Sequence, residues 1–220
     1  MFMQQVHANS RLLDSCMLHL PRLYAIIDVE CFPKGEGLAF VPEAFADAGV
    51  TLLQYRNKSG NAREMLEQAR QLRRTLGHSV KLIMNDRADL ALAAGFDGVH
   101  VGQDDLSPEA ARRVIGNDLW LGVSTHNPAQ VTETDKTSAD YIAVGPVFAT
   151  TSKARPDPVI GLQGVRIARK LTRKPLVAIG GITRANCRSV IAAGADSVAV
   201  ISDLVQEPRK SAEEFLRILR

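Results

Sequence analysis

The chain has 220 residues, of which 45% are hydrophobic and 23% are charged, and its formal net charge is +3 at pH 7. This balance is ordinary for a globular protein and excludes a mainly disordered chain. No run of basic residues favours nucleic acid as a partner. No apolar stretch approaches the roughly 18 residues of a spanning helix, so we expect no membrane partner. The cysteines at 16, 31 and 187 are too widely spaced for a disulfide framework or a zinc site, so a cytoplasmic location is expected.

From residue 22 onward, short runs rich in Val, Ile and Leu alternate with amphipathic stretches that often end at a glycine. The apolar runs are continuous rather than alternating, which is typical of strands buried on both faces. We predict strands at Leu23–Asp28, Thr51–Arg56, Lys81–Asp86, Gly98–Gly102, Trp120–Ser124, Tyr141–Pro146, Pro175–Gly181 and Ser197–Ser202.

Helix signals fall between these runs. Ser107 followed by Pro108, and Asn127 followed by Pro128, are typical helix starts. Thr183 and Ser211 are the expected N-caps of the last two helices. We predict helices at Val41–Ala48, Ala62–Leu76, Arg87–Ala94, Pro108–Ile115, Pro128–Thr137, Leu162–Leu171, Arg184–Ala193 and Ala212–Leu219.

Eight strand–helix units in about 200 residues predict an α/β fold, a single-domain (β/α)₈ TIM barrel over residues 22–220. Residues 1–21 precede this pattern and are interpreted as an extra N-terminal segment, either a first helix or a frayed leader. An open doubly wound sheet is the alternative fold. It would normally carry a glycine-rich turn after the first strand, and residues 28–33 contain no glycine. The phrases Ala93–Val99 and Ala192–Val198 resemble each other locally, as repeated units would.

Polar side chains follow the carboxyl ends of the predicted strands, where barrels carry their functional groups. Asp86 and Asp105 end neighbouring strands, and such a carboxylate pair suits a Mg²⁺ ion that also binds substrate phosphates. The cations Arg56, Lys58 and Lys153 approach the same mouth, as a metal–diphosphate site requires. The alternative interpretation is a set of solvated surface ion pairs.

A second anion site is predicted after the seventh strand. Gly180 and Gly181 open a helix there, where bare backbone N–H groups can hold a phosphate, and Ser202 after the eighth strand would complete the site. The alternative is a tight turn that merely needs glycine. Two anion sites together indicate a two-substrate transfer that expels pyrophosphate.

Three further side chains have open roles. His126 follows the fifth strand and is either an acid–base group or a hydrogen-bonded structural histidine. His100 lies within the fourth strand, and a place in the core is expected. Tyr24 in the first strand either stacks on a substrate ring or fills the barrel.

These residues together resemble the thiamine phosphate synthase family over residues 22–219. The segments that carry the resemblance are Gln54–Lys58, Met84–Asp89, Gly98–Asp105, Gly122–His126, Gly145–Phe148, Thr150–Lys153 and Ala178–Ile182. The resemblance implies an enzyme that joins hydroxymethylpyrimidine diphosphate to hydroxyethylthiazole phosphate, giving thiamine phosphate and pyrophosphate.

The resemblance also implies residue roles. Asp86 and Asp105 would bind Mg²⁺, the expected cofactor, and Arg56, Lys58, Ser124 and Lys153 would act in catalysis at the diphosphate. The implied substrate contacts are Gln54, Tyr55, Arg56, Asn57, Lys58, Asn85, Ser124, Thr150, Thr151, Ser152, Lys153, Gly180, Ile201 and Ser202. Within this set, Thr150 and Ser152 would contact the thiazole substrate, and Gly180, Ile201 and Ser202 would hold its phosphate.

Two other functions stay open on the sequence. A thiazole tautomerase of the same barrel family is an isomerase and needs no metal–diphosphate pocket, whereas Asp86, Asp105, Arg56 and Lys58 are all present here. A non-catalytic paralogue that binds thiazole phosphate would not need the carboxylates either. Small-molecule substrates are the expected partners, and association into a homo-oligomer is left open.

Overall fold

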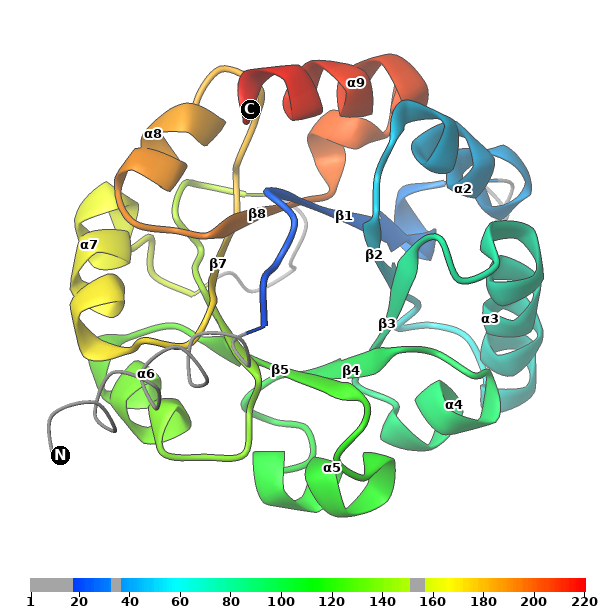
Figure 1. The fold of residues 1–220 in the computed structure, drawn as a ribbon, viewed down its shortest axis with the longest axis horizontal. Coiled ribbons are helices and arrows are strands. Elements are labelled where there is room, and N and C mark those ends of the chain that lie inside the picture. Colours follow the sequence, from blue (N-terminus) through cyan, green and yellow to red (C-terminus); the bar gives the residue numbers. More distant parts are fainter. Residues whose placement is uncertain (1–17, 33–36, 151–156) are drawn as a thin grey trace, which may run out of the picture.

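A computed structural model of the chain describes residues 18–32, 37–150 and 157–220. Its eight strands are all parallel and close into a barrel in the order β1 to β8, with β8 paired to β1. Figure 1 shows the helices forming a ring around this barrel. The predicted TIM barrel is confirmed, and the open doubly wound sheet is excluded because β1 and β8 are hydrogen-bonded neighbours.

The strands are β1 (Leu23–Asp28), β2 (Leu52–Arg56), β3 (Lys81–Asn85), β4 (Gly98–Val101), β5 (Trp120–Thr125), β6 (Tyr141–Val144), β7 (Leu176–Ile179) and β8 (Ser197–Val200). The first and last residues of each strand lie within two positions of the predicted ones. Four of them are buried along their whole length, as expected for strands covered by helices on one face and by the barrel interior on the other.

The α-helices are α2 (Gly37–Ala48), α3 (Ala62–Leu76), α4 (Ala88–Ala93), α5 (Pro108–Ile115), α6 (Pro128–Asp135), α7 (Gly161–Leu171), α8 (Cys187–Ala192) and α9 (Pro208–Ile218). Short 3₁₀ turns follow β1 (η1, Val29–Cys31) and β8 (η3, Ser202–Leu204). The side chains of Ser107 and Asn127 cap α5 and α6 by accepting the backbone N–H three residues on, as predicted.

Three predicted helix starts are wrong. Helix α2 is described from Gly37, four residues before the predicted start at Val41, and Pro42 lies inside it. Helix α8 begins at Cys187 rather than Arg184 because Asn186 first closes a turn, accepting from the Thr183 N–H and donating to the Gly181 carbonyl. Helix α9 begins at Pro208, so Ser211 is a buried residue of its first turn and not its cap. The backbone N–H of Ser211 donates to the Glu207 carbonyl, as in the interior of a helix.

Alternate residues of each strand face the barrel interior. The buried cluster there includes Tyr24 and Ile26 of β1, Leu52 of β2 and Tyr141 of β6. The intervening residues, such as Tyr55, belong to a larger cluster between the strands and the helices. A side chain's parity in its strand therefore decides whether it can reach the interior.

The segment before β1 closes one end of the barrel. Leu18 and Leu20 pack against the interior cluster while His19 is exposed, and Figure 1 shows this segment crossing the barrel opening. Residues 1–17 of the predicted N-terminal segment lie outside the described residues. Among the helices that the structure does describe, none is long and apolar enough to cross a membrane.

Candidate active site at the carboxyl ends of the strands

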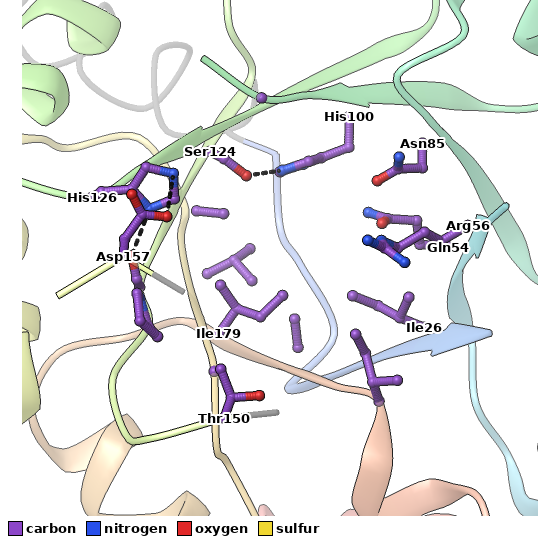
Figure 2. A pocket seen from close by; sticks show the side chains of 18 of the residues that line it. Ile26, Gln54, Arg56, Asn85, His100, Ser124, His126, Thr150, Asp157 and Ile179 are labelled. Atoms are coloured by element: carbon purple, nitrogen blue, oxygen red, sulfur yellow. Dashed lines mark hydrogen bonds and ion pairs between the residues drawn. The ribbon is translucent and has the colours of Figure 1, made fainter. Parts of the chain in front are cut away.

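A cavity of about 490 Å³ opens at the carboxyl ends of the strands. Figure 2 shows Gln54, Arg56 and Asn85 on one side of it and Ser124, His126 and Asp157 facing them. The predicted strand-end residues that line it are Arg56, Asp86, Gly102, Ser124, Pro146, Gly180 and Ser202. The sequence predicts that these residues, together with Asp28, share one rim because they end separate strands. Seven of the eight line the cavity, whereas Asp28 at the end of β1 does not line it and pairs with Arg56.

Arg56 is held by a buried carboxylate. Its guanidinium forms an ion pair with Asp28, whose side chain is only 3% exposed, and the two residues are neighbours in the β1–β2 ladder. Burial raises the pKa of Asp28, and the adjacent Arg56 opposes that rise. Glu30 also lies 3.9 Å from the same guanidinium nitrogen, Nη1. Because a guanidinium has five N–H donors, Arg56 keeps those of its other nitrogens, as far as the described residues show, for an anion in the cavity.

Asp86 and Asp105 adjoin at the ends of β3 and β4. Burial, followed by the neighbouring Asp105 carboxyl, raises the pKa of Asp86. The Lys58 ammonium pairs with Asp86, and the Gly102 N–H donates to Asp105 Oδ2 at 2.8 Å. A half-buried carboxylate, Asp86, and an exposed one, Asp105, lie side by side and repel each other, so the pair favours a cation between them.

The backbone of Asp86 reinforces this interpretation. Its φ is +61°, and among the described residues it is the one position other than glycine with a positive φ. The left-handed conformation is uncommon for a residue with a Cβ, and such conformations concentrate at functional sites. Here it lets the chain turn sharply after β3 while the carboxylate stays at the cavity.

The opposite wall is apolar and ends in the two-glycine turn. Val177, Ile179 and Ala199 contribute its surface, and the Gly180–Gly181 turn and Ser202 lie at its rim. A Cβ on Gly180 would lie 2.5 Å from Pro146 Cβ, and one on Gly181 would lie 2.4 Å from the Ala149 carbonyl oxygen. The glycines therefore permit close packing of this turn against the segment after β6, besides exposing backbone at the cavity.

Most of the predicted substrate contacts that the structure describes line this cavity. They are Gln54, Arg56, Lys58, Asn85, Ser124, Thr150, Gly180, Ile201 and Ser202. Tyr55 and Asn57 do not line it, since both side chains hydrogen-bond to Gln68 on α3. Their placement does not support direct substrate contacts. Thr151, Ser152 and Lys153 lie outside the described residues.

His126 is engaged on both ring nitrogens. Its Nδ1 lies 2.7 Å from the Gly145 carbonyl oxygen, and its Nε2 lies 3.5 Å from Asp157 Oδ2. The ring therefore joins the end of β5 to the segments that follow β6. This placement favours the structural interpretation of His126, and its chemical role stays a prediction.

Sequence reasoning missed several side chains of the cavity. Gln103 donates to the Ser124 carbonyl at 2.6 Å, and His100, expected in the core, is buried yet reaches the cavity through Ser124. Burial lowers the pKa of His100 to about 4. The alternation of inward and outward residues along a strand could have indicated this, because His100 and Ser124 both occupy inward-facing positions on the paired strands β4 and β5.

Comparison with known proteins agrees with this site. The family model described as thiamine monophosphate synthase matches residues 23–204. The chain belongs to the thiamine monophosphate synthase family. A thiamine-phosphate synthase from Koribacter versatilis is 64% identical over 206 residues, which are 92% of this chain and 97% of the relative. One from Chloroflexus aurantiacus is 48% identical over 185 residues, 84% of this chain and 85% of the relative.

A solved structure extends the likeness to three dimensions. The thiamine phosphate pyrophosphorylase from Pyrococcus furiosus has 36% identity and a TM-score of 0.79, covering 90% of this chain and 95% of the other. The family match spans β1 to η3, so it includes every strand end that lines the cavity.

Proposed function

We propose that this chain is a Mg²⁺-dependent transferase that joins hydroxymethylpyrimidine diphosphate to hydroxyethylthiazole phosphate, releasing thiamine phosphate and pyrophosphate. The observation that carries the proposal is the single cavity in which the Asp86–Asp105 pair, Arg56 and Lys58 face the two-glycine turn. One side suits a metal-bound diphosphate, and the other suits a monophosphate. The relatives that carry the synthase name support it.

The donor set suits Mg²⁺ because two carboxylates supply hard oxygen ligands and leave other positions for water and phosphate. When bound, the ion would neutralise charge on the diphosphate and so make pyrophosphate a better leaving group. Asp86 and Asp105 would hold it. Lys58, which pairs with Asp86, would then turn toward the diphosphate oxygens.

The reaction needs one bond to break and one to form. The C–O bond between the pyrimidine methylene and the diphosphate breaks, and the electron pair leaves with pyrophosphate. The thiazole nitrogen then donates its lone pair to the methylene carbon. Because that nitrogen carries no proton, no general base is required, and the arrangement of cations does the catalytic work by stabilising the departing charge.

The chain's own residues divide this work by position. Arg56 and Lys58 from β2 and the loop after it would bind the diphosphate together with Ser124 of β5, and Lys153 would approach from the segment after β6. Backbone N–H groups at Gly180 and at residues 201–202 would hold the thiazole phosphate. The apolar wall of Val177, Ile179 and Ala199 would keep water from the electron-deficient methylene.

The synthase would act in the cytoplasm on soluble small molecules, a setting that suits the two free cysteines, Cys31 and Cys187, found among the described residues. The thiazole tautomerase and the non-catalytic paralogue account less well for the carboxylate pair and its cations.

The test is an assay with both substrates and Mg²⁺, following thiamine phosphate and pyrophosphate. We expect equal amounts of the two products, no turnover with either substrate alone, and loss of activity when a chelator removes the metal. Isomerisation of the thiazole phosphate without the diphosphate or Mg²⁺ would identify a tautomerase instead. Tight binding of thiazole phosphate with no turnover would identify a binding protein.

A further inference from the structure

A continuous line of hydrogen-bonded side chains crosses the barrel beneath the cavity. Gln54 Nε2 lies 2.9 Å from the Tyr24 hydroxyl, which lies 3.0 Å from the Tyr141 hydroxyl. The Tyr141 hydroxyl lies 3.1 Å from His100 Nδ1, and His100 Nε2 lies 2.8 Å from Ser124 Oγ. The line joins β2 to β5 through β1, β6 and β4, and Figure 2 shows its last link between His100 and Ser124.

The barrel leaves space for this line at Gly122, in the middle of β5. A Cβ there would lie 2.1 Å from Tyr141 Cζ and 2.5 Å from His100 Nδ1. Any side chain at 122 would therefore separate Tyr141 from His100. A glycine inside a strand often marks such a close approach, so the contact is a built feature of the barrel.

With the amide nitrogen of Gln54 toward Tyr24, as in this structure, the hydrogen bonds of the line point in one direction. An amide nitrogen donates and cannot accept, so the Tyr24 oxygen accepts from Gln54. Within the described part of the chain, the one acceptor in contact with the Tyr24 hydroxyl proton is then Tyr141. The Tyr141 proton in turn goes to His100 Nδ1. A neutral imidazole that accepts at Nδ1 carries its proton at Nε2, and that N–H donates to Ser124 Oγ.

This direction decides what Ser124 offers to a ligand. Because Ser124 Oγ accepts from His100, its own proton turns away from the imidazole, and Ser124 lines the cavity. With the other tautomer, Ser124 would donate to His100 and present only lone pairs to the cavity. A hydroxyl that donates attracts a phosphate oxygen, whereas one that presents lone pairs repels it.

We propose that His100 is a positioning residue, held as the Nε2–H tautomer by Tyr141 and Tyr24, which makes Ser124 a hydrogen-bond donor to the diphosphate. The proposal rests on the proposed function for the presence of a diphosphate at Ser124. The tautomer itself does not depend on that function, because Gln54 fixes the direction of the line from the far side of the barrel.

The first test measures the tautomer in the full-length protein without substrate. Nitrogen-15 NMR of the imidazole, assigned by the signals lost in His100→Asn, should show a protonated Nε2 and an unprotonated, hydrogen-bonded Nδ1. The Tyr24→Phe variant removes the link to Gln54 and should yield a mixture of tautomers. A protonated Nδ1 in the unaltered protein would overturn the proposal, whether or not the protein makes thiamine phosphate.

The second test asks whether His100 acts through Ser124. Glutamine can place a donor near the Nε2 position, but the shorter asparagine cannot. We expect His100→Asn to lower kcat by about 10- to 100-fold, the range for one hydrogen bond to a charged group. His100→Gln should recover most of that loss, with KM for the thiazole phosphate unchanged in both variants.

A double variant makes the kinetic test specific. In a Ser124→Ala background, His100→Asn should lower kcat by less than about a further twofold, because the residue through which His100 acts is already absent. If the kcat losses of the two single variants instead multiply in the double variant, the proposal is contradicted. His78→Asn, at an exposed histidine on the turn before β3, is the matched control and should keep full activity. If His100→Asn does not fold, Tyr24→Phe and His100→Gln carry the same two tests.

Discussion

The two carboxylates at the mouth of the cavity repel each other unless a cation lies near them. Lys58 pairs with Asp86, and the pKa of Asp86 is raised by burial and by Asp105. We therefore expect Asp105→Asn to lower activity at limiting Mg²⁺ by about 10²-fold or more, since a lost carboxylate weakens a site built from two. Titrating activity against Mg²⁺ measures the effect.

Higher Mg²⁺ should partly restore the activity of the Asp105→Asn variant. Its affinity for thiazole phosphate should stay near normal, because the proposed phosphate site at the Gly180–Gly181 turn lies on the opposite wall of the cavity. The exposed Asp118, changed to Asn, serves as a charge-matched control. Unaltered activity of Asp105→Asn at limiting Mg²⁺ would show that the carboxylate is no metal ligand.

His100 makes the stability of the protein depend on pH. Its folded-state pKa is lowered by burial to about 4, below the usual value of about 6.5 for an unfolded histidine. Between these values the unfolded chain binds more protons than the folded protein, so stability rises with pH. Because of His100, the free energy of unfolding should therefore fall by on the order of 3 kcal/mol as the pH falls from about 6.5 to 4.

The measurement compares the free energy of unfolding of the unaltered protein and of His100→Asn across this pH range. The variant should show a shallower slope, because asparagine does not titrate. His78→Asn, a change at an exposed histidine outside the barrel interior, is the matched control. Parallel curves for all three proteins would mean that His100 can be protonated inside the barrel.

At the scale of elements, one ion-pair arrangement recurs three times at the amino ends of the strands. In each case an aspartate lies just before an even-numbered strand, β4, β6 or β8. Its carboxylate accepts from the first or second backbone N–H of the odd-numbered strand that comes before it in the chain. It also accepts from an arginine on the helix that precedes this odd-numbered strand. The three pairs are Asp97 with Arg73, Asp140 with Arg112, and Asp196 with Arg169, at 2.5, 2.7 and 2.8 Å. The backbone donors are Leu82, Leu121 and Leu176.

Each arginine also binds backbone carbonyls of the adjoining turns. Arg73 donates to the carbonyls of Gly77 and Gly95 at 2.6 and 2.9 Å. One guanidinium thus connects a helix end, a strand end and the next turn. This recurrence explains the local likeness between Ala93–Val99 and Ala192–Val198, because each phrase carries one of the three aspartates.

Asp97→Asn tests this arrangement. Burial would raise the pKa of Asp97, but hydrogen bonds from the Leu82 N–H and Arg73 hold it below the usual value. The carboxylate therefore stabilises the fold above the unfolded pKa of about 4, and this contribution is lost as the pH falls through the lower folded value. At pH 7 we expect the variant to lose about 2–3 kcal/mol, since the half-buried Arg73 is left without its anion.

Denaturant unfolding at several pH values measures this loss. The deficit of Asp97→Asn should shrink below pH 4, where the unaltered carboxylate takes up a proton. Asp47→Asn is the matched control, because Asp47 pairs with Arg209 at 3.6 Å between two exposed side chains. Such pairs contribute between 0 and about 1 kcal/mol. Equal losses for the two variants would contradict the role of the buried arrangement.

At the scale of the whole molecule, the barrel has one functional end and one end that is closed by chain. Leu18 and Leu20 pack against the interior cluster from the side opposite the cavity. Replacing both with alanine should destabilise the protein by about 2–4 kcal/mol in total, less than two fully buried leucines would cost. Thermal unfolding measures the loss.

The kinetic constants of the double variant should change little at temperatures where it stays folded, since the cavity lies at the other end of the barrel. Leu92→Ala, at a leucine that is 46% exposed on α4, is the matched control and should be close to neutral. A double variant as stable as this control would mean that the segment before β1 does not close the barrel.

Much of this molecule was determined by local sequence. The continuous apolar runs identified all eight strands, and the capping residues Asn127 and Ser107 fixed the starts of their helices within a residue. Strand ends also predicted the shared rim, because parallel strands around a barrel must bring their carboxyl ends to one face. These features depend on residues close in sequence, whose physical chemistry is visible there.

Only the tertiary structure decided how side chains far apart in sequence pair with one another. The sequence shows that Tyr55 follows Gln54, but strand parity turns Tyr55 toward α3 and leaves Gln54 in the barrel. Likewise, Tyr24 and Tyr141 lie 117 residues apart, and their hydroxyl contact exists because the closed barrel brings β1 and β6 across its interior. Closure sets these distances, and no local signal encodes them, so the polar line to Ser124 appears only in the folded protein.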